Sequence, residues 1–126
     1  MKKYILIFFA AITYSIAIAK TSTNSNISTC LKKANGVTSE ISNCITADSN
    51  IQDMRLNKAY RDLMNQEKSI PRKKKIQEAQ RLWIKFRDAN CNSYADTEGG
   101  TLEDLAVREC YRKSTEQRAK ELESLK

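Results

Sequence analysis

Four cysteines constrain this 126-residue chain more than any other feature, because they fall into two groups around glycines. Cys30 and Cys44 enclose Gly36, and Cys91 and Cys110 enclose Gly99-Gly100. Four cysteines permit three pairings. Residues equidistant from the turn of an antiparallel helical hairpin lie opposite each other, which favours pairing within each group. Each closed loop is expected to raise the free energy of unfolding by about 3 kcal/mol, through the lower entropy of the unfolded chain.

The N-terminus has the pattern of a secretory signal peptide. Two lysines near the start of the chain are followed by an apolar stretch over residues 4–16. Ala17-Ile18-Ala19 then places small residues at the positions that a signal peptidase recognises. We predict a signal over residues 1–19 that is cleaved between Ala19 and Lys20, leaving a periplasmic or secreted protein without an integral membrane segment. Two alternatives are an uncleaved membrane anchor and a lipoprotein, since residues 27–30 loosely resemble a lipobox.

The rest of the chain has helical periodicity and few helix breakers. It contains one proline and three glycines, and no stretch alternates with the period of a strand. We predict an all-α fold, a small disulfide-stapled hairpin or bundle of about three to four helices. A flexible leader is expected over 20–29, followed by a domain over 30–126. Thr38 is a predicted N-cap, Pro71 is expected at the first position of a helix, and polar residues 48–53 predict a kink or break.

The expected core consists of apolar residues at helical spacing on three helices. They are Ile41, Ile45, Leu56, Ala59, Tyr60 and Leu63; then Ile76, Ala79, Trp83, Phe86 and Tyr94; then Leu102, Leu105, Cys110, Leu122 and Leu125. Tyr60, Trp83 and Phe86 are predicted to form its aromatic centre. Thr101 with Asp104 resembles a capping box at the start of the last helix.

Short motifs run through this region in a fixed order. They are Asp53-x-x-Leu56-Asn57-x-x-Tyr60-x-x-Leu63, then Ala79-Gln80-x-x-Trp83-x-x-x-Arg87-Asp88-x-x-Cys91, then Gly99-Gly100, Cys110, Thr115, Arg118 and Leu122. With Cys30 and Cys44, they resemble the LprI-like family of exported bacterial proteins, named for a mycobacterial lysozyme inhibitor. The resemblance implies a small helical domain held by disulfides and a lysozyme-inhibitor-like role. The name-giving member is similar to a lipoprotein, whereas this chain is predicted to be free of a lipid anchor.

The motif residues are interpreted as structural, with a polar ligand groove as the alternative. The structural set is Asp53, Leu56, Asn57, Tyr60, Gln80, Trp83, Arg87 and Asp88. Arg87 is predicted to form a bidentate pair with Asp53. Asn57, Gln80 or Asp53 is expected to bond the buried polar atoms of the tyrosine and tryptophan.

The side-chain inventory argues against an enzyme. The chain has no histidine, which removes the usual general base and metal ligand, and its cysteines are expected in disulfides rather than as thiolates. The chain has no C-x-x-C pair of the kind that binds zinc, and it has no glycine-rich loop of the kind that binds phosphate. The acids Glu98, Glu103 and Asp104 lie near the glycine pair, but one tryptophan and a few tyrosines are too few to line a sugar cleft. We predict no catalytic residue, no metal and no cofactor.

Two segments are candidate binding elements. The loop over 92–101 carries Tyr94, Asp96, Glu98, Gly99 and Gly100, and its acids could approach a basic lysozyme cleft. The predicted partner of this loop is lysozyme or another exported protein.

The second segment is a basic patch formed by Arg72, Lys73, Lys74 and Lys75. The formal charge of +7 falls to +5 when the two lysines of the signal are removed, and this excess could attract an anionic envelope component, either polymer or lipid. The positive charge also opposes binding to a basic lysozyme. An accessory role without inhibition is a further alternative, and nucleic acid is excluded by the exported location.

Overall fold

The computed structural model describes residues 24–95 and 99–125, which form four helices and no strand. These are α1 (Asn24–Ala34), α2 (Thr38–Gln66), α3 (Ile70–Asn92) and α4 (Thr101–Ser124). Both predicted disulfides are present, with Cα–Cα distances of 5.8 Å for Cys30–Cys44 and 5.4 Å for Cys91–Cys110. The all-α fold and the pairing within each cysteine group are therefore confirmed.

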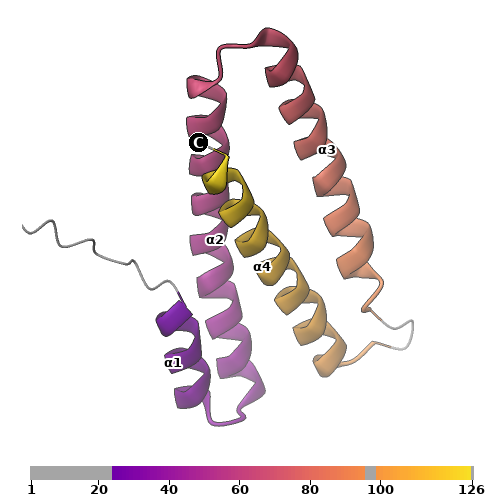
Figure 1. The fold of residues 1–126 in the computed structure, drawn as a ribbon. Helices are drawn as coiled ribbons and strands as arrows, with labels where there is room; N and C mark the ends of the chain where they lie inside the picture. The colour runs from indigo at the N-terminus through magenta and orange to yellow at the C-terminus, as the bar shows by residue number, and fades with distance from the viewer. Residues whose placement is uncertain (1–23, 96–98, 126) are drawn as a thin grey trace, which may run out of the picture.

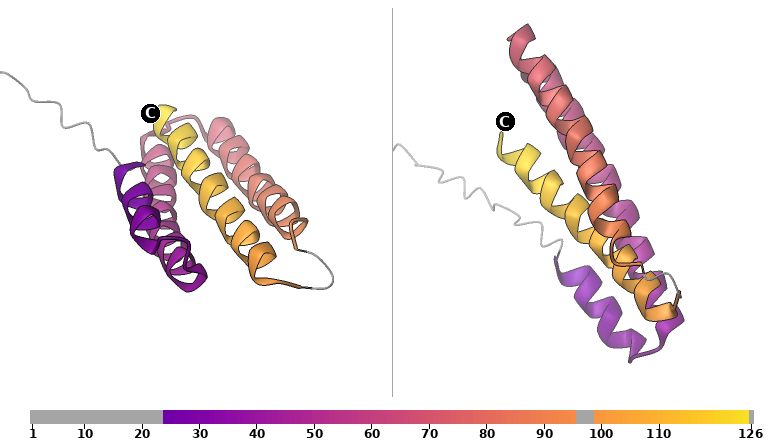
Figure 2. Two further views of the ribbon diagram at one scale, coloured as in Figure 1. Left: turned by 90° about the horizontal axis from the view of Figure 1, so that it is seen from below. Right: turned by 90° about the vertical axis from the view of Figure 1, so that its right-hand side faces the viewer.

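The helices pack in a row rather than as a closed bundle (Figure 1). The most extensive contact joins α2 and α4, although a whole helix separates them in the sequence. The helix α1 folds back along the first part of α2, and α3 packs chiefly on α4. Two further views show α3 at the edge of the molecule, running beside α4 in the opposite direction (Figure 2). One long side of α3 is consequently uncovered.

The core lies where α2 meets α4. It contains Leu56, Ala59 and Leu63 from α2 and Ala119 and Leu122 from α4, which are at most 6% exposed. Tyr60, Ile76 and Trp83 pack against its edge and are partly buried. No helix in the described part of the chain is long and apolar enough to cross a membrane.

The helix starts differ from three sequence predictions. The helix α1 begins at Asn24, so residues 24–29 are helical rather than part of a flexible leader; residues 1–23, with the predicted signal, lie outside the described range. Val37 rather than Thr38 is the N-cap of α2. The N-cap of α4 is Gly100 and not Thr101, so no capping box forms there. The side chain of Asp104 instead accepts a 2.7 Å hydrogen bond from Arg108.

The predicted kink at residues 48–53 is absent, and α2 continues through this segment. Asp48 and Gln52 are buried, with exposures of 5% and 1%. They continue the buried line of Ile45, Leu56, Ala59 and Leu63 at spacings of three and four residues, which keeps them on the face that α4 covers. The polar composition of this segment therefore reflects a buried polar contact and not a break.

The predicted aromatic centre is wrong in one member, since the side chain of Phe86 is 66% exposed. Ala79 and Tyr94 on the α3 side, and Leu102 and Leu125 at the two ends of α4, are also exposed. Because α3 has one main neighbour, only a narrow line of its residues is covered. That line runs through Ile76, Gln80, Trp83, Arg87 and Cys91.

Candidate functional site

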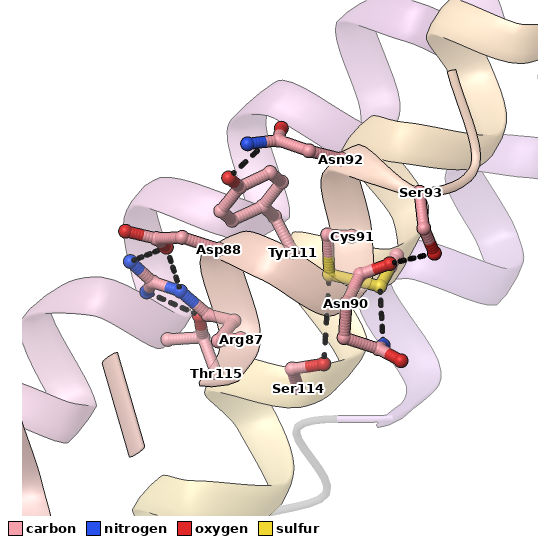
Figure 3. The surroundings of a disulfide bond; sticks show 10 residues. Arg87, Asp88, Asn90, Cys91, Asn92, Ser93, Tyr111, Ser114 and Thr115 are labelled. Carbon is pink, nitrogen blue, oxygen red and sulfur yellow. Dashed lines mark hydrogen bonds and ion pairs between the residues drawn. A yellow bond between two sulfur atoms is a disulfide. The ribbon is translucent and has the colours of Figure 1, made fainter. Parts of the chain in front are cut away.

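The disulfide Cys91–Cys110 joins the last turn of α3 to the first half of α4 and anchors the loop between them (Figure 3). Polar side chains surround the sulfurs: the amide of Asn90 donates to Cys110 Sγ over 3.5 Å, and the hydroxyl of Ser114 lies 3.9 Å from Cys91 Sγ. Cys91 itself is fully buried. The two helix ends are therefore held at a fixed separation on either side of the loop.

The entry to the loop is also ordered by hydrogen bonds. The hydroxyl of Ser93 donates to the carbonyl of Asn90 over 2.7 Å, and the backbone N–H of Tyr94 donates to the carbonyl of Cys91 over 3.2 Å. On the α4 side, Tyr111 donates to the side chain of Asn92 over 3.3 Å (Figure 3). We call this end of the molecule, formed by residues 90–95 and 99–106, the stapled end.

The predicted binding loop is described only in part. Tyr94 is 54% exposed at the stapled end. Gly99 has a φ of +67°, in the left-handed region that glycine adopts without strain, and Gly100 is extended. Asp96 and Glu98 lie outside the described residues.

Arg87 links α3 to α4 beside this end, but not through the predicted partner. Its guanidinium donates to Asp88 at 3.0 Å and to the hydroxyl of Thr115 at 3.3 Å (Figure 3). Asp53 is exposed on α2. The predicted pair between Arg87 and Asp53 is therefore wrong, because α4 and not α2 lies against this face of α3.

Two arginines and two aromatic rings form a connected cluster across the α3–α4 contact. The guanidinium carbon of Arg87 lies 5.0 Å from the ring centre of Trp83 and 5.1 Å from that of Tyr111. The guanidinium carbon of Arg118 lies 5.8 Å from the Trp83 ring. Cation–π contacts at such distances contribute about 0.5–2 kcal/mol each. Trp83 thus helps to hold α3 against α4.

The remaining motif residues divide between the interface and the surface. Leu56 is in the core, Tyr60 is at its edge, and the side-chain oxygen of Gln80 accepts a 3.0 Å hydrogen bond from Arg118. Asn57 is exposed on α2, like Asp53. The motif residues therefore do not gather around one groove.

A buried charge cluster around Arg112, which the sequence analysis missed, fastens α4 to α2. Arg112 is 5% exposed and contacts Asp48 at 2.8 Å, Glu109 at 2.7 Å and Glu116 at 3.1 Å. Gln52 donates to Asp48 over 3.3 Å. The available signal was the spacing: Arg112, Thr115 and Ala119 continue a three-and-four repeat that ends at the core residue Leu122.

These contacts lower the pKa values of two glutamates and raise the pKa of Arg112, so that each charged form is favoured. A hydrogen bond from Lys120, aided by Arg112, holds the pKa of Glu116 below its ordinary value. Burial works to raise the pKa of Glu109, but the hydrogen bonds and charge of Arg112 outweigh it, and the pKa is lowered. The hydrogen bonds that Arg112 donates to Glu109 raise the pKa of Arg112. The lowered pKa values keep Glu109 and Glu116 ionised near neutral pH beside Arg112, and the cluster acts as a structural element.

The predicted basic patch lies in the first turns of α3, far from the stapled end. Ser69 caps the helix by accepting from the N–H of Arg72 over 3.4 Å, and Arg72 pairs with Glu67 at 2.9 Å. A hydrogen bond from the backbone of Ser69 lowers the pKa of Glu67. Lys74 and Lys75 are exposed, and Lys73 is half-buried.

Residues 24–95 and 99–125 offer no group of three or more His, Cys, Asp or Glu side chains that could hold a metal ion. All four cysteines are in disulfides.

Comparison with known proteins gives one match. The family model described as "Lysozyme inhibitor LprI" matches residues 30–122 of the chain. No curated protein and no solved structure matches it. The matched range begins at the first disulfide cysteine and ends at the core residue Leu122.

Proposed function

Because the chain belongs to the LprI family of lysozyme inhibitors, we propose that it is an exported binding protein that blocks the cleft of a partner, with lysozyme as the target that the family implies. The family match over residues 30–122 carries this proposal. The predicted signal peptide over residues 1–19 would direct the chain to the periplasm or the exterior.

The stapled end is the part of the molecule best suited to enter a cleft. The disulfide and the hydrogen bonds of Ser93 and Tyr94 hold the loop ends before any partner binds. A preordered loop loses less conformational entropy on binding than a free one. Tyr94 is exposed there, and tyrosine is among the residues enriched at energetically dominant interface positions.

The distribution of charge removes an objection to a basic lysozyme as target. The stapled end carries Glu103 and Asp104 in the first turn of α4. The sequence adds two acids to the preceding loop, Asp96 and Glu98, which lie outside the described residues. The basic patch begins α3, so Lys75 lies about 25 Å along the helix from Asn92 at 1.5 Å per residue. Charges at that distance are screened at physiological salt, where the Debye length is about 8 Å. A basic cleft at the stapled end would therefore meet Glu103 and Asp104 rather than the basic patch, with Lys113 as the cation that shares a pocket with Tyr94.

The direct test is lysis of cell-wall substrate by several lysozyme types in the presence of the purified protein. We expect at least one lysozyme to be slowed, and Tyr94→Ala to weaken that inhibition about tenfold or more, the cost of truncating a typical energetically dominant interface residue. Met54→Ala is the matched control, since Met54 is exposed on α2, away from the stapled end. If no lysozyme is slowed at micromolar excess, the chain is better described as an accessory protein without inhibitory role.

A second candidate function is binding of an anionic envelope component, polymer or lipid, through the basic patch. The supporting observation is that Lys74 and Lys75 are exposed and form no ion pair among the described residues. Salt distinguishes the two functions, because attraction to a polyanion weakens steeply as salt rises, whereas a loop seated in a cleft is affected less.

A further inference from the structure

The excess positive charge of the protein is concentrated on one helix. In α3 there are seven basic residues (Arg72, Lys73, Lys74, Lys75, Arg81, Lys85 and Arg87) and two acidic residues (Glu78 and Asp88). In α2 there are three basic and four acidic residues, and in α4 five basic and six acidic residues. The short helix α1 has two lysines and no acid, so α3, with seven basic and two acidic residues, carries most of the excess positive charge.

The cations of α3 also differ from those of α4 in their pairing. All five basic residues of α4 contact carboxylates; they are Arg108, Arg112, Lys113, Arg118 and Lys120. On α3, Arg72 and Arg87 are paired. Lys73 lies near enough to Glu67 for its charge to help lower the pKa of that carboxyl. Within the described part of the chain, the remaining cations of α3, Lys74, Lys75, Arg81 and Lys85, form no ion pair with a carboxylate.

Bulky apolar side chains lie beside these unpaired cations. Leu82 is 58% exposed and Phe86 is 66% exposed, and the two are four residues apart on one side of α3. Arg81 and Lys85 lie on the adjoining side, about 100° around the helix. Trp83 and Arg87 point to α4 instead. We call the surface formed by Lys74, Lys75, Arg81, Leu82, Lys85 and Phe86 the α3 outer face.

We infer that the α3 outer face is a docking surface for an anionic phospholipid bilayer. This activity is distinct from the blocking of a cleft, and it specifies lipid as the anionic partner in the second candidate function. A helix that lies in a membrane interface combines apolar tips, which enter the headgroup region, with cations that meet the phosphates. The long stems of lysine and arginine let the apolar tips sink while the charges stay at the surface. The position of α3 at the edge of the molecule leaves this face accessible (Figure 2).

Two other occupants fit the surface less well. A soluble polyanion would use the cations but has no use for Leu82 and Phe86. A second copy of the chain would bring unpaired cations against unpaired cations, and such like-charge contact opposes association. Charge complementarity together with the exposed apolar pair therefore favours a lipid surface.

The test is co-sedimentation of the full exported chain with vesicles of phosphatidylcholine alone and of phosphatidylcholine mixed with phosphatidylglycerol. We expect binding to the mixed vesicles only, weakening as salt is raised. Lys74→Gln with Lys75→Gln should weaken binding about 30-fold, from the typical contribution of two basic residues near an anionic bilayer. Leu82→Ser with Phe86→Ser should weaken it at least tenfold at unchanged charge. Lys32→Gln with Lys33→Gln, a pair of exposed lysines on α1, is the matched charge control and should change binding less than threefold.

Three outcomes would overturn the inference. One is no binding to phosphatidylglycerol vesicles at low salt. Another is an equal loss in the α1 control, which would make the attraction a matter of net charge. The third is binding of inorganic polyphosphate with no effect of the Leu82 and Phe86 changes, which would leave the second candidate function standing in its polymer form. Lysozyme inhibition is tested separately, because we propose that it uses the stapled end, which shares no residue with the α3 outer face.

Discussion

Arg112 is the residue on which the packing of α4 against α2 most depends. It places one guanidinium among three carboxylates, those of Asp48, Glu109 and Glu116. Loss of one partner from a buried ion pair leaves the others charged and without compensation, which costs more than the pair itself contributes. Glu109 and Glu116 lie on α4 with Arg112, whereas Asp48 lies on α2. The Arg112–Asp48 pair therefore favours the α2–α4 register that brings these two charges together.

Arg112→Ala is expected to lower the free energy of unfolding by about 3–5 kcal/mol, the usual cost of breaking a buried ion pair. Urea unfolding followed by circular dichroism measures this. Arg108→Ala is the matched control on the same helix; its exposed pair with Asp104 should contribute less than about 1 kcal/mol. Equal losses in the two variants would contradict the structural role of the cluster.

Acid is expected to destabilise the protein through the same cluster. The pKa values of Glu109 and Glu116 are lowered in the folded state. Their contribution to stability is therefore fully present above the ordinary value of 4.5 and is lost as pH falls below it towards the folded pKa values. The melting temperature should fall over this range, and the fall should be shallower in Glu116→Gln. An identical slope in the variant and the parent would show that other acids are responsible.

At the scale of elements, α3 is held to the molecule mainly through α4. The contacts that hold it are the Cys91–Cys110 disulfide, the Arg87 hydrogen bond to Thr115 and the cluster of Trp83 with Arg87 and Arg118. They lie on the half of α3 nearest the stapled end. The first half of α3, with the basic patch, has fewer attachments.

Removal of the second disulfide should affect both stability and recognition. Cys91→Ala with Cys110→Ala is expected to cost about 3 kcal/mol, from the entropy of an opened loop, and to weaken lysozyme inhibition because the loop ends are no longer held. Cys30→Ala with Cys44→Ala is the matched control and should cost a similar amount of stability while inhibition persists. If both double variants inhibit equally well, the Cys91–Cys110 disulfide has no part in recognition.

The intact mass of the parent chain should rise by four hydrogens on full reduction.

At the scale of the whole molecule, the two proposed surfaces lie at different places on α3. The stapled end carries exposed Tyr94 and the acids of the first turn of α4, whereas the α3 outer face carries unpaired cations. An inhibitor attached to a membrane through the outer face would still present the stapled end. The geometry thus allows both activities in one small domain.

We therefore expect the two activities to separate by mutation. Lys74→Gln with Lys75→Gln should lose vesicle binding and keep lysozyme inhibition within twofold, because the patch is screened from the loop at physiological salt. Tyr94→Ala should do the reverse. Parallel vesicle and lysis assays on the same preparations measure this, and a variant that loses both activities while remaining folded would contradict the separation.

The sequence by itself determined the features that depend on local geometry. Helical periodicity, the glycines at 36 and 99–100, and Pro71 placed most helices and turns, because each reflects backbone preference within a few residues. The two disulfides followed from the same logic, since each cysteine pair closes a single hairpin with a sequence separation of 14 or 19 residues. Motif spacing likewise identified the family.

The covered face of each helix follows only from how distant helices pack. Asp48 and Gln52 belong to the polar segment that predicts a break, yet they are buried because Arg112 approaches from 64 residues further along the chain. Helical spacing predicts Phe86 in the core, yet it is exposed because α3 has one main neighbour, and Arg87 meets α4 rather than Asp53. Burial depends on which distant helices meet, and the periodicity of one helix contains no information about its neighbour. The pairing of α2 with α4 therefore determined both the charged core and the uncovered cationic face.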